Sequence, residues 1–205
     1  MNEIPPNIEL EKNPERRALE ELNDLGLRME DMIGKKTLDI GAGDAAIGQA
    51  AHRRGIDVVS LDTKPPVSQD IPYVIASAEK LPFEDESFDY VISHAGPLVI
   101  APSREIMIKV LQEARRVLKE GGQLRFGPGN LNANIFTSEE LFTPKEEEQF
   151  TTEQRIERIG QKALEFLHSI DDSITQEDIP NPTWEIPVSR FYRLEKITEK
   201  NAAQP

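Results

Sequence analysis

The feature that most constrains the fold of this chain is a glycine turn between a short apolar run and a segment of small residues. It lies within Thr37–Gly48, which reads Thr-Leu-Asp-Ile-Gly-Ala-Gly-Asp-Ala-Ala-Ile-Gly. Glycine adopts positive φ at little cost and lets a ligand approach the main chain closely. We therefore predict a strand, a tight turn at Gly41 and Gly43, and a helix, with the turn binding something small and polar.

Apolar runs alternate with helical patterns on both sides of this turn. The sequence predicts strands at 37–40, 57–61, 73–76, 90–93 and 123–126, and helices at 45–55 and 103–119. Such alternation is typical of an α/β fold with a mostly parallel sheet and helices on both faces. Two further strands, 183–188 and 190–197, are expected to form a C-terminal antiparallel hairpin.

The remaining segments complete one expected domain of 205 residues. Residues 1–12 are expected to form an N-terminal arm and 198–205 a tail. A helix over 13–34 begins with Asn13 as its cap and Pro14 at its first position, and its apolar stripe runs through Leu19, Leu22, Leu25 and Met29. A later helix begins at Thr151 or Thr152. We expect 35–127 to form the core of the domain and 128–197 to add a further helix and the hairpin.

Composition narrows the function classes. The formal net charge is −13, which disfavours binding to a nucleic-acid backbone. The absence of cysteine excludes disulfides and thiolate zinc sites and is compatible with the cytoplasm. No apolar run is long enough to cross a membrane, and the N-terminus does not resemble a signal peptide. No His, Asp or Glu cluster has metal-ligand spacing, so no metal is predicted.

Four polar features lie at the carboxyl ends of predicted strands, where open α/β sheets bind their ligands. They are the stretch Asp39–Asp44, Asp62 about twenty residues after the glycines, Ser77-Ala78-Glu79, and Ser93-His94. A glycine turn with a downstream acid fits a dinucleotide as well as other nucleoside cofactors. Asp44, expected at a helix start, would repel a pyrophosphate, so a ligand with an amino group and a positive centre fits better. An NAD-dependent oxidoreductase remains an alternative.

Three motifs in order make the chain resemble a class I S-adenosylmethionine-dependent methyltransferase of the small methyltransferase-11, or ubiquinone/menaquinone-methylating, type. They are Leu38–Gly43, the run Ala78–Phe83 with the following Glu84–Val91, and Glu113–Gly122. Together they cover about residues 35–127. The resemblance implies a Rossmann-like, seven-stranded, mostly parallel sheet and S-adenosylmethionine as cofactor.

The resemblance also implies roles for individual residues. The backbone at Gly41, Ala42 and Gly43 would lie against the methionine part of the cofactor, and Asp39 would hold its amino group. Asp62, followed by Thr63, would accept the ribose hydroxyls. The adenine edge would meet the Ala78 N–H between Ser77 and Glu79, and the amino-acid end would lie near Ser93 and His94. The family often has aspartate where this chain has Ser77, and a third glycine where it has Asp44 or Ala45.

The expected reaction is direct transfer of a methyl group to a small-molecule acceptor, without nucleic acid or membrane as partner. His94 is the one candidate catalytic base, because a neutral imidazole can take a proton from an acceptor. Candidates for the acceptor pocket are Gly127–Asn130, Phe136, Trp184 and Tyr192. The alternative is a non-catalytic binding or regulatory protein that keeps the fold. The sequence predicts neither the acceptor nor the oligomeric state.

Overall fold

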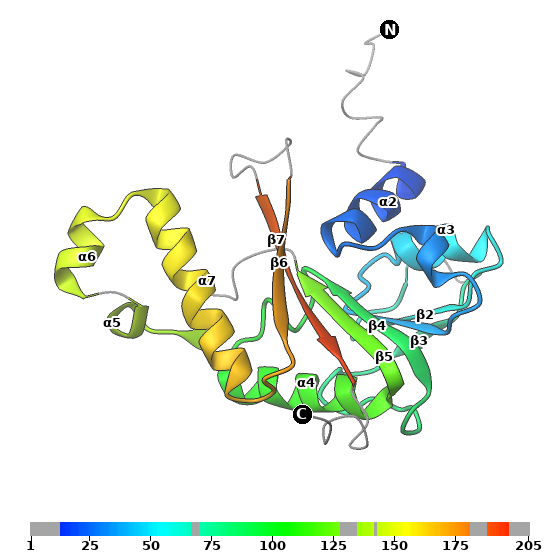
Figure 1. The fold of residues 1–205 in the computed structure, drawn as a ribbon. Helices are drawn as coiled ribbons and strands as arrows, with labels where there is room; N and C mark the ends of the chain where they lie inside the picture. The colour runs from blue at the N-terminus through cyan, green and yellow to red at the C-terminus, as the bar shows by residue number, and fades with distance from the viewer. Residues whose placement is uncertain (1–12, 67–69, 128–134, 142, 181–187, 197–205) are drawn as a thin grey trace, which may run out of the picture.

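The computed structural model describes residues 13–66, 70–127, 135–141, 143–180 and 188–196, and these form a single twisted sheet flanked by helices (Figure 1). The strand order is β3-β2-β1-β4-β5-β7-β6. Strands β1 to β5 pair in parallel, and β7 is antiparallel to both β5 and β6. The expected fold class is therefore confirmed. The strand bounds are β1 Thr37–Ile40, β2 Val58–Asp62, β3 Tyr73–Ile75, β4 Phe88–His94, β5 Leu118–Gly127, β6 Thr175–Pro180 and β7 Val188–Glu195.

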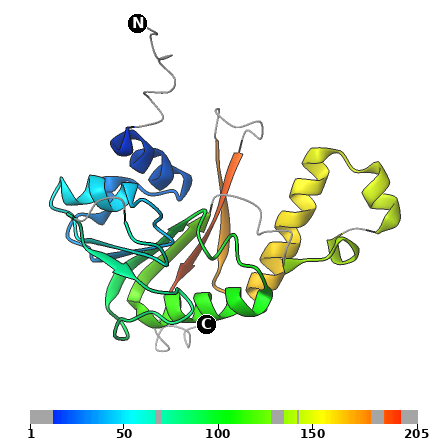
Figure 2. The same ribbon diagram turned by 180° about the vertical axis from the view of Figure 1, so that it is seen from behind.

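Helices cover both faces of this sheet (Figures 1 and 2). One face carries α2 and α3, and the other carries α4, with α7 beside it. In Figure 1, α6 lies on the side of α7 that faces away from the sheet. The helix bounds are α2 Pro14–Asp24, the 3₁₀ turn η1 Met29–Met32, α3 Ala46–His52, α4 Arg104–Val117, α5 Ser138–Leu141, α6 Pro144–Gln149 and α7 Thr152–His168.

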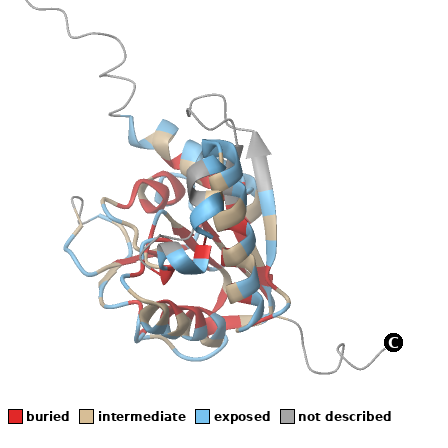
Figure 3. Ribbon diagram, turned by 90° about the vertical axis from the view of Figure 1, so that its left-hand side faces the viewer, coloured by how far each residue is buried: buried red, intermediate tan, exposed pale blue. Residues whose placement is uncertain are grey.

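The hydrophobic core lies in two layers, one on each face of the sheet, and the buried residues are red in Figure 3. Successive residues of a strand point to opposite faces. Val91 accordingly packs in the layer beneath α4, whereas Ile92 packs beneath α2 and α3. Phe191 and Tyr192 of β7 divide between the layers in the same way. Central strands buried on both faces hold the carboxyl ends of β1, β2 and β4 in fixed positions.

The predicted N-terminal helix is shorter than expected. Asn13 caps it as predicted, since its Oδ1 accepts from the N–H groups of Glu15 and Arg16. The helix ends at Asp24, however, because the chain turns at Gly26 with φ +64°. A Cβ at Gly26 would lie 2.5 Å from the Phe191 ring, so only glycine fits this contact. The expected stripe is also wrong at Leu19, which is 43% exposed.

The C-terminal hairpin exists, but its first strand lies earlier than predicted. β6 occupies 175–180 rather than 183–188, and 181–187 lie outside the described residues. β6 is the last strand of the described sheet and carries Gln176, Glu177 and Asp178. Polar residues are common on an edge strand. Because β6 therefore lacks the apolar alternation by which strands are predicted, the sequence did not reveal it. The expected arm and tail also lie outside the described residues.

Arg104 joins α4 to the helices that follow the sheet. Its Nε donates to the Ile135 carbonyl at 2.6 Å and its Nη2 to Glu140 at 2.7 Å. Its guanidinium lies 4.9 Å from the centre of the Phe136 ring and 5.5 Å from that of Phe166. One side chain therefore ties α5 and α7 to the first turn of α4.

We expect Arg104→Ala to loosen this attachment by about 1–3 kcal/mol, because it removes hydrogen bonds and cation–π contacts together. Amide hydrogen exchange should become faster in 135–141 and 152–168 and remain unchanged in β1 and β2. Lys109→Ala is the matched control, since Lys109 lies on the same helix and pairs only with Glu105 among the described ion pairs. Equal exchange in the two variants would contradict this role for Arg104.

Candidate functional site

The glycine turn after β1 is held against the end of β2. The N–H groups of Gly41 and Ala42 donate to the Leu61 carbonyl at 2.7 and 3.0 Å. Gly41 has φ +75° and Gly43 has φ +56°, so both adopt the left-handed conformation that favours glycine. Only Gly41 is also tightly enclosed, since a Cβ there would lie 2.5 Å from Pro97 Cδ. The loop after β4 thus packs directly on the turn.

Asp62, the last residue of β2, joins the turn to its own strand. Its Oδ2 accepts from the Gly43 N–H at 3.0 Å and its Oδ1 from the Lys64 N–H at 3.0 Å. The Tyr73 hydroxyl lies 3.2 Å from the Gly43 carbonyl and 3.0 Å from the Lys64 carbonyl. The Asp62 carboxylate is therefore fixed in orientation, and Tyr73 is a supporting residue that the sequence reasoning missed.

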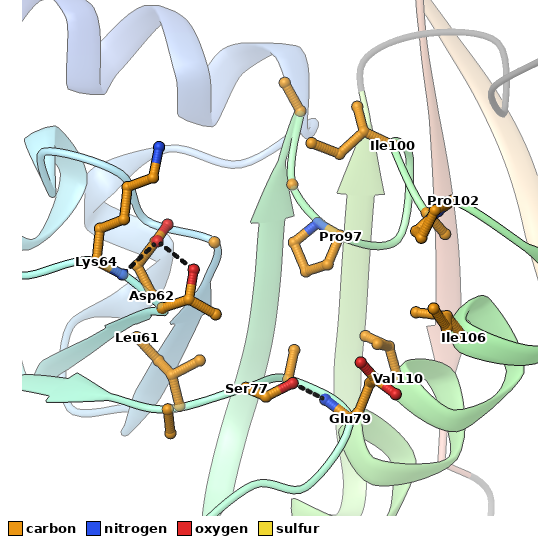
Figure 4. Close-up of a pocket in the computed structure, with 17 residues that line it drawn as sticks. Leu61, Asp62, Lys64, Ser77, Glu79, Pro97, Ile100, Pro102, Ile106 and Val110 are labelled. Carbon is orange, nitrogen blue, oxygen red and sulfur yellow. Dashed lines mark hydrogen bonds between the residues drawn. The ribbon is translucent and has the colours of Figure 1, made fainter. Parts of the chain in front are cut away.

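Two cavities open at the carboxyl ends of β1, β2 and β4. The larger, of about 430 Å³, has Asp62 and Lys64 on one side and Ile106 and Val110 of α4 on the other (Figure 4). Pro97, Ile100 and Pro102 from the loop after β4 add apolar surface. The smaller, of about 300 Å³, is lined by Arg17, Glu21, Asp39, Gly41, Ala42, Gly43, Asp44, His94 and Ala95.

The two cavities share Gly41 and Ala95, so they are adjoining parts of one cleft. The larger part combines many apolar side chains with Asp62, Lys64 and Glu79, whereas five of the nine residues that line the smaller part are ionisable. Ala95 has φ +46°, an uncommon conformation for a residue other than glycine. Such backbone strain occurs most often at binding and catalytic sites.

Every cofactor-binding residue predicted from the sequence lines this cleft, with one exception. The residues that line it are Asp39, Gly41, Ala42, Gly43, Asp62, Thr63, Ser77, Ala78, Glu79 and His94. The exception is Ser93, whose side chain is fully buried and donates to the Ile40 carbonyl at 3.0 Å. Its hydroxyl joins β4 to β1 beneath the cleft. The place of Ser93 at the end of a predicted strand did not indicate this structural role.

Asp39 has an unusual electrostatic environment. It is 3% exposed on β1. Burial raises the pKa of Asp39 to about 8, and the charges of Glu21 and Asp62 act in the same direction. Burial also raises the pKa of Glu21, against the opposing effect of His94 and Arg17. The Asp39 carboxyl therefore holds a proton at neutral pH. Its stabilising effect on the fold is complete below pH about 4 and is lost as the pH rises through about 8.

Helix α2 supplies three residues of the site that the sequence reasoning missed. Arg17 contacts Asp44 and lies 3.0 Å from Glu21. Asp24 Oδ2 lies 3.2 Å from His94 Nε2. Residues 17, 21 and 24 are spaced i, i+4 and i+7, which places them on one face of a helix. That polar stripe is the signal in the sequence that could have revealed them.

The structure also changes the reading of Asp44. Helix α3 begins at Ala46, so Asp44 precedes the helix rather than standing at its start. Arg17 contacts the Asp44 carboxylate. The predicted repulsion between Asp44 and a pyrophosphate is therefore weaker than the sequence suggested, and the choice of cofactor depends on other observations.

The residues predicted for the acceptor pocket do not line either described cavity. Phe136 is 8% exposed and packs edge-on against Phe166. Tyr192 is fully buried and stacks on Phe126 with ring centres 5.2 Å apart. Gly127 is buried at the end of β5, where its carbonyl accepts from Ala95 N–H. Residues 128–130 and Trp184 lie outside the described residues.

The described residues contain neither a metal-binding group nor a membrane-spanning helix. Among these residues, no group of three His, Asp or Glu side chains is placed to hold a metal ion. In the same part of the chain, no helix is long and apolar enough to cross a membrane.

Comparison with known proteins shows what the segment that carries this cleft is similar to. Residues 38–126 match a family model described as a methyltransferase domain, and this segment runs from β1 to β5. The sequence resemblance is thus confirmed, and the cofactor of this class of domain is S-adenosylmethionine.

Two further comparisons name proteins to which this chain is similar in sequence or in fold. Over 104 residues the chain is 34% identical to the demethylmenaquinone methyltransferase of Paenarthrobacter aurescens, covering 47% of this chain and 39% of that protein. The chain spans about two fifths of the length of the curated relatives it matches. A protein of Methanococcus maripaludis, described as an S-adenosyl-L-methionine-dependent methyltransferase, has the same fold, with a TM-score of 0.58, 17% identity and coverage of 97% and 98% of the two chains.

A third neighbour has a ligand in its structure. The 1,6-didemethyltoxoflavin-N1-methyltransferase of Burkholderia thailandensis, solved with 1,6-didemethyltoxoflavin and S-adenosylhomocysteine, has a TM-score of 0.53 at 14% identity. The comparison covers 94% of this chain and 82% of that one. At this identity the likeness concerns the fold.

Proposed function

We propose that this chain binds S-adenosylmethionine along the cleft and transfers its methyl group to a small-molecule acceptor. The observation that carries the proposal is the fixed Asp62 carboxylate in one part of the cleft and the buried Asp39 in the adjoining part. A nucleoside with a charged amino-acid tail has hydroxyls at one end and an ammonium and a carboxylate at the other. The two parts of the cleft match these groups in the same order.

The larger part would hold the adenosine. Asp62 would accept a hydrogen bond from each of the two ribose hydroxyls. The backbone N–H groups of Gly43 and Lys64 hold its two oxygens in place, and a carboxylate has further lone pairs to accept with. The adenine would lie between the strand end at Ser77–Glu79 and the apolar side chains of Ile106 and Val110. Ser77 Oγ is already an acceptor for the Glu79 N–H at 3.2 Å, so it orders this loop as well as facing the base.

The smaller part would hold the methionine end. Arg17 is the cation on its wall that carries a permanent charge, and it would bind the carboxylate of the cofactor. Asp39 would bind the ammonium, aided by Glu21. The sulfonium would then lie near Gly41 and Ala95, where the two parts meet. Positioning an acceptor in line with its methyl carbon can supply most of the rate acceleration.

A small-molecule acceptor is the proposal best supported for this chain. The names of the demethylmenaquinone methyltransferase and of the 1,6-didemethyltoxoflavin-N1-methyltransferase each give a small molecule as the acceptor. The loop after β4 adds Pro97, Ile100 and Pro102 to the cleft, and Ile100 is 59% exposed. Exposed apolar surface at the edge of a cleft favours a partly apolar acceptor over a highly charged one.

Isothermal calorimetry with S-adenosylmethionine and S-adenosylhomocysteine tests the proposed cofactor. We expect one site per chain for each compound and no heat with NAD. Transfer of a labelled methyl group to a small-molecule fraction then tests the reaction. Binding of NAD but not of S-adenosylhomocysteine would contradict the proposal, and binding without any transfer would favour a non-catalytic protein.

Proton release provides a test of the role of Asp39. The cofactor ammonium favours the ionised carboxyl, so binding at pH 7 should release close to one proton from Asp39. Because the pKa of Asp39 is about 8 in the free protein, the affinity for the cofactor should rise as the pH approaches 8. Above pH 8 the affinity should level off. Calorimetry in buffers of different ionisation enthalpy measures this proton.

Asp39→Asn should weaken cofactor binding and abolish the proton release. The same substitution should raise the melting temperature of the ligand-free protein at pH 8, because it removes a carboxyl that is costly to ionise in its buried position. An Asp39→Asn variant that still releases the proton would show that another group titrates.

A further inference from the structure

Helix α2 and the end of β4 are joined by a contact between Asp24 and His94, to which the proposed cofactor site assigns no role. His94 Nε2 lies 3.2 Å from Asp24 Oδ2, across seventy residues of sequence. The side chain of Asp24 is 11% exposed and that of His94 is 20% exposed. Asp24 is the last residue of α2 and His94 the last of β4, so two rigid elements fix the pair.

The contact determines which nitrogen of His94 is available for chemistry. A neutral imidazole carries one N–H and one lone pair. With its Nε2–H donated to the Asp24 carboxylate, the lone pair resides on Nδ1. A carboxylate that accepts the imidazole N–H also stabilises the charge the ring gains when it takes a proton. Asp24 thus prepares His94 to act as a base.

His94 lies where such a base would be useful. It lines the smaller cavity beside Ala95, one of the two residues at which the parts of the cleft meet. The charged or titratable groups that share this cavity are Arg17 and Glu21 of α2, Asp39 of β1 and Asp44 of the turn. Arg17 lies 3.0 Å from Glu21 and contacts Asp44, so these three partly offset one another. Asp24 contacts His94 directly.

We infer that His94 is a catalytic base positioned by Asp24, and that the acceptor bears a weakly acidic hydroxyl or a protonated nitrogen. This inference rests on the proposed function. In the reaction, the acceptor proton passes to His94 Nδ1, and the electron pair of that O–H or N–H bond becomes the lone pair of the acceptor. This lone pair forms a bond to the methyl carbon while the bond from that carbon to sulfur breaks, and S-adenosylhomocysteine leaves. A thiolate, which is already ionised, would need no such base.

A purely structural pair would have different consequences. If the contact served only to attach α2 to the sheet, its loss would lower stability and cofactor affinity and leave the pH dependence of methyl transfer unchanged. If it serves as inferred, isosteric variants should lose far more in kcat than in cofactor affinity and should lose the base. The two readings therefore separate in the pH profile.

The experiment compares the parent chain with His94→Gln and Asp24→Asn. His52→Gln is the control, because His52 lies exposed at the end of α3, outside the cleft. Each protein receives S-adenosylmethionine with a tritiated methyl group and a panel of phenols, amines and thiophenols, from pH 5.5 to 9. Calorimetry with S-adenosylhomocysteine and thermal melting run in parallel, and Asp24→Glu tests rescue of the pair.

For the parent and His52→Gln we expect transfer to a phenol or an amine, with a rate that rises with pH and then levels off. His94→Gln should lower kcat by about 10²–10⁴-fold and abolish that rise, with a much smaller effect on cofactor affinity than on kcat. Asp24→Asn should lower kcat less and displace the rise, and Asp24→Glu should restore part of it.

The inference fails if His94→Gln methylates phenols and amines at the parent rate, or if the parent methylates thiophenols alone. It also fails if the parent binds the cofactor and methylates no member of the panel. A parent chain that binds no cofactor is a different result and contradicts the proposed function instead.

Discussion

Replacement of Asp62 by alanine should weaken the binding of S-adenosylmethionine by about 100-fold or more. Two hydrogen bonds from ribose hydroxyls to a carboxylate contribute about 1.5 kcal/mol or more each, and each 1.4 kcal/mol is a factor of ten in affinity. The substitution also frees the Gly43 and Lys64 N–H groups, which Asp62 now holds. Calorimetry with S-adenosylhomocysteine measures the loss.

Asp57→Ala is the control for this prediction. Asp57 is exposed just before the first residue of β2, and its backbone carbonyl, which the substitution leaves in place, accepts from the Thr37 N–H. Asp62→Asn should lie between the alanine variant and the parent, because an amide keeps one acceptor and loses the charge. Equal affinities for Asp62→Ala and Asp57→Ala would contradict the proposed ribose site.

The second large effect is expected at Gly41, with Gly43 as its matched control. Both residues have positive φ, so alanine at either position costs about 1–2 kcal/mol in backbone conformation. Only at Gly41 does the new Cβ meet other atoms, at 2.5 Å from Pro97 Cδ and 3.1 Å from Gly96 Cα. A Cβ at Gly43 would meet no heavy atom within 4 Å outside the two neighbouring residues of the chain.

Urea unfolding should therefore show a loss of about 2–5 kcal/mol for Gly41→Ala and of about 1–2 kcal/mol for Gly43→Ala. Gly41→Ala should also lose cofactor affinity, because the loop after β4 must move and that loop lines both parts of the cleft. Equal stability losses for the two variants would show that the contact between the turn and Pro97 is unimportant.

The parts of this fold that the sequence predicts well are those with strong local signals. β1 matches its predicted bounds, and β2 to β4 lie within two or three residues of theirs, because buried parallel strands are continuous apolar runs. The cap at Asn13 is likewise correct, and Thr151, one of the two residues expected to begin the later helix, is its cap, since a cap depends on a few adjacent residues. The elements placed wrongly are those whose limits depend on distant contacts, such as the end of α2 at Gly26 against Phe191.

The candidate site shows the same division. Residues on the strand ends could be predicted because topology alone brings the carboxyl ends of β1, β2 and β4 together. Arg17, Glu21 and Asp24 could not, because their place in the cleft depends on how α2 packs against α3 and β4. The apolar stripe of α2 showed which face is buried, but the packing of that helix decides that its polar stripe faces the glycine turn.

The position of the cofactor is central to the proposed function, and a crystal structure with S-adenosylhomocysteine tests that position most directly. We predict the ribose hydroxyls within hydrogen-bond distance of Asp62 and the ammonium beside Asp39. The sulfur should lie near Gly41 and Ala95, on the side of the cleft that His94 lines. A cofactor bound elsewhere, or one whose amino-acid end lies in the larger part of the cleft, would contradict the account.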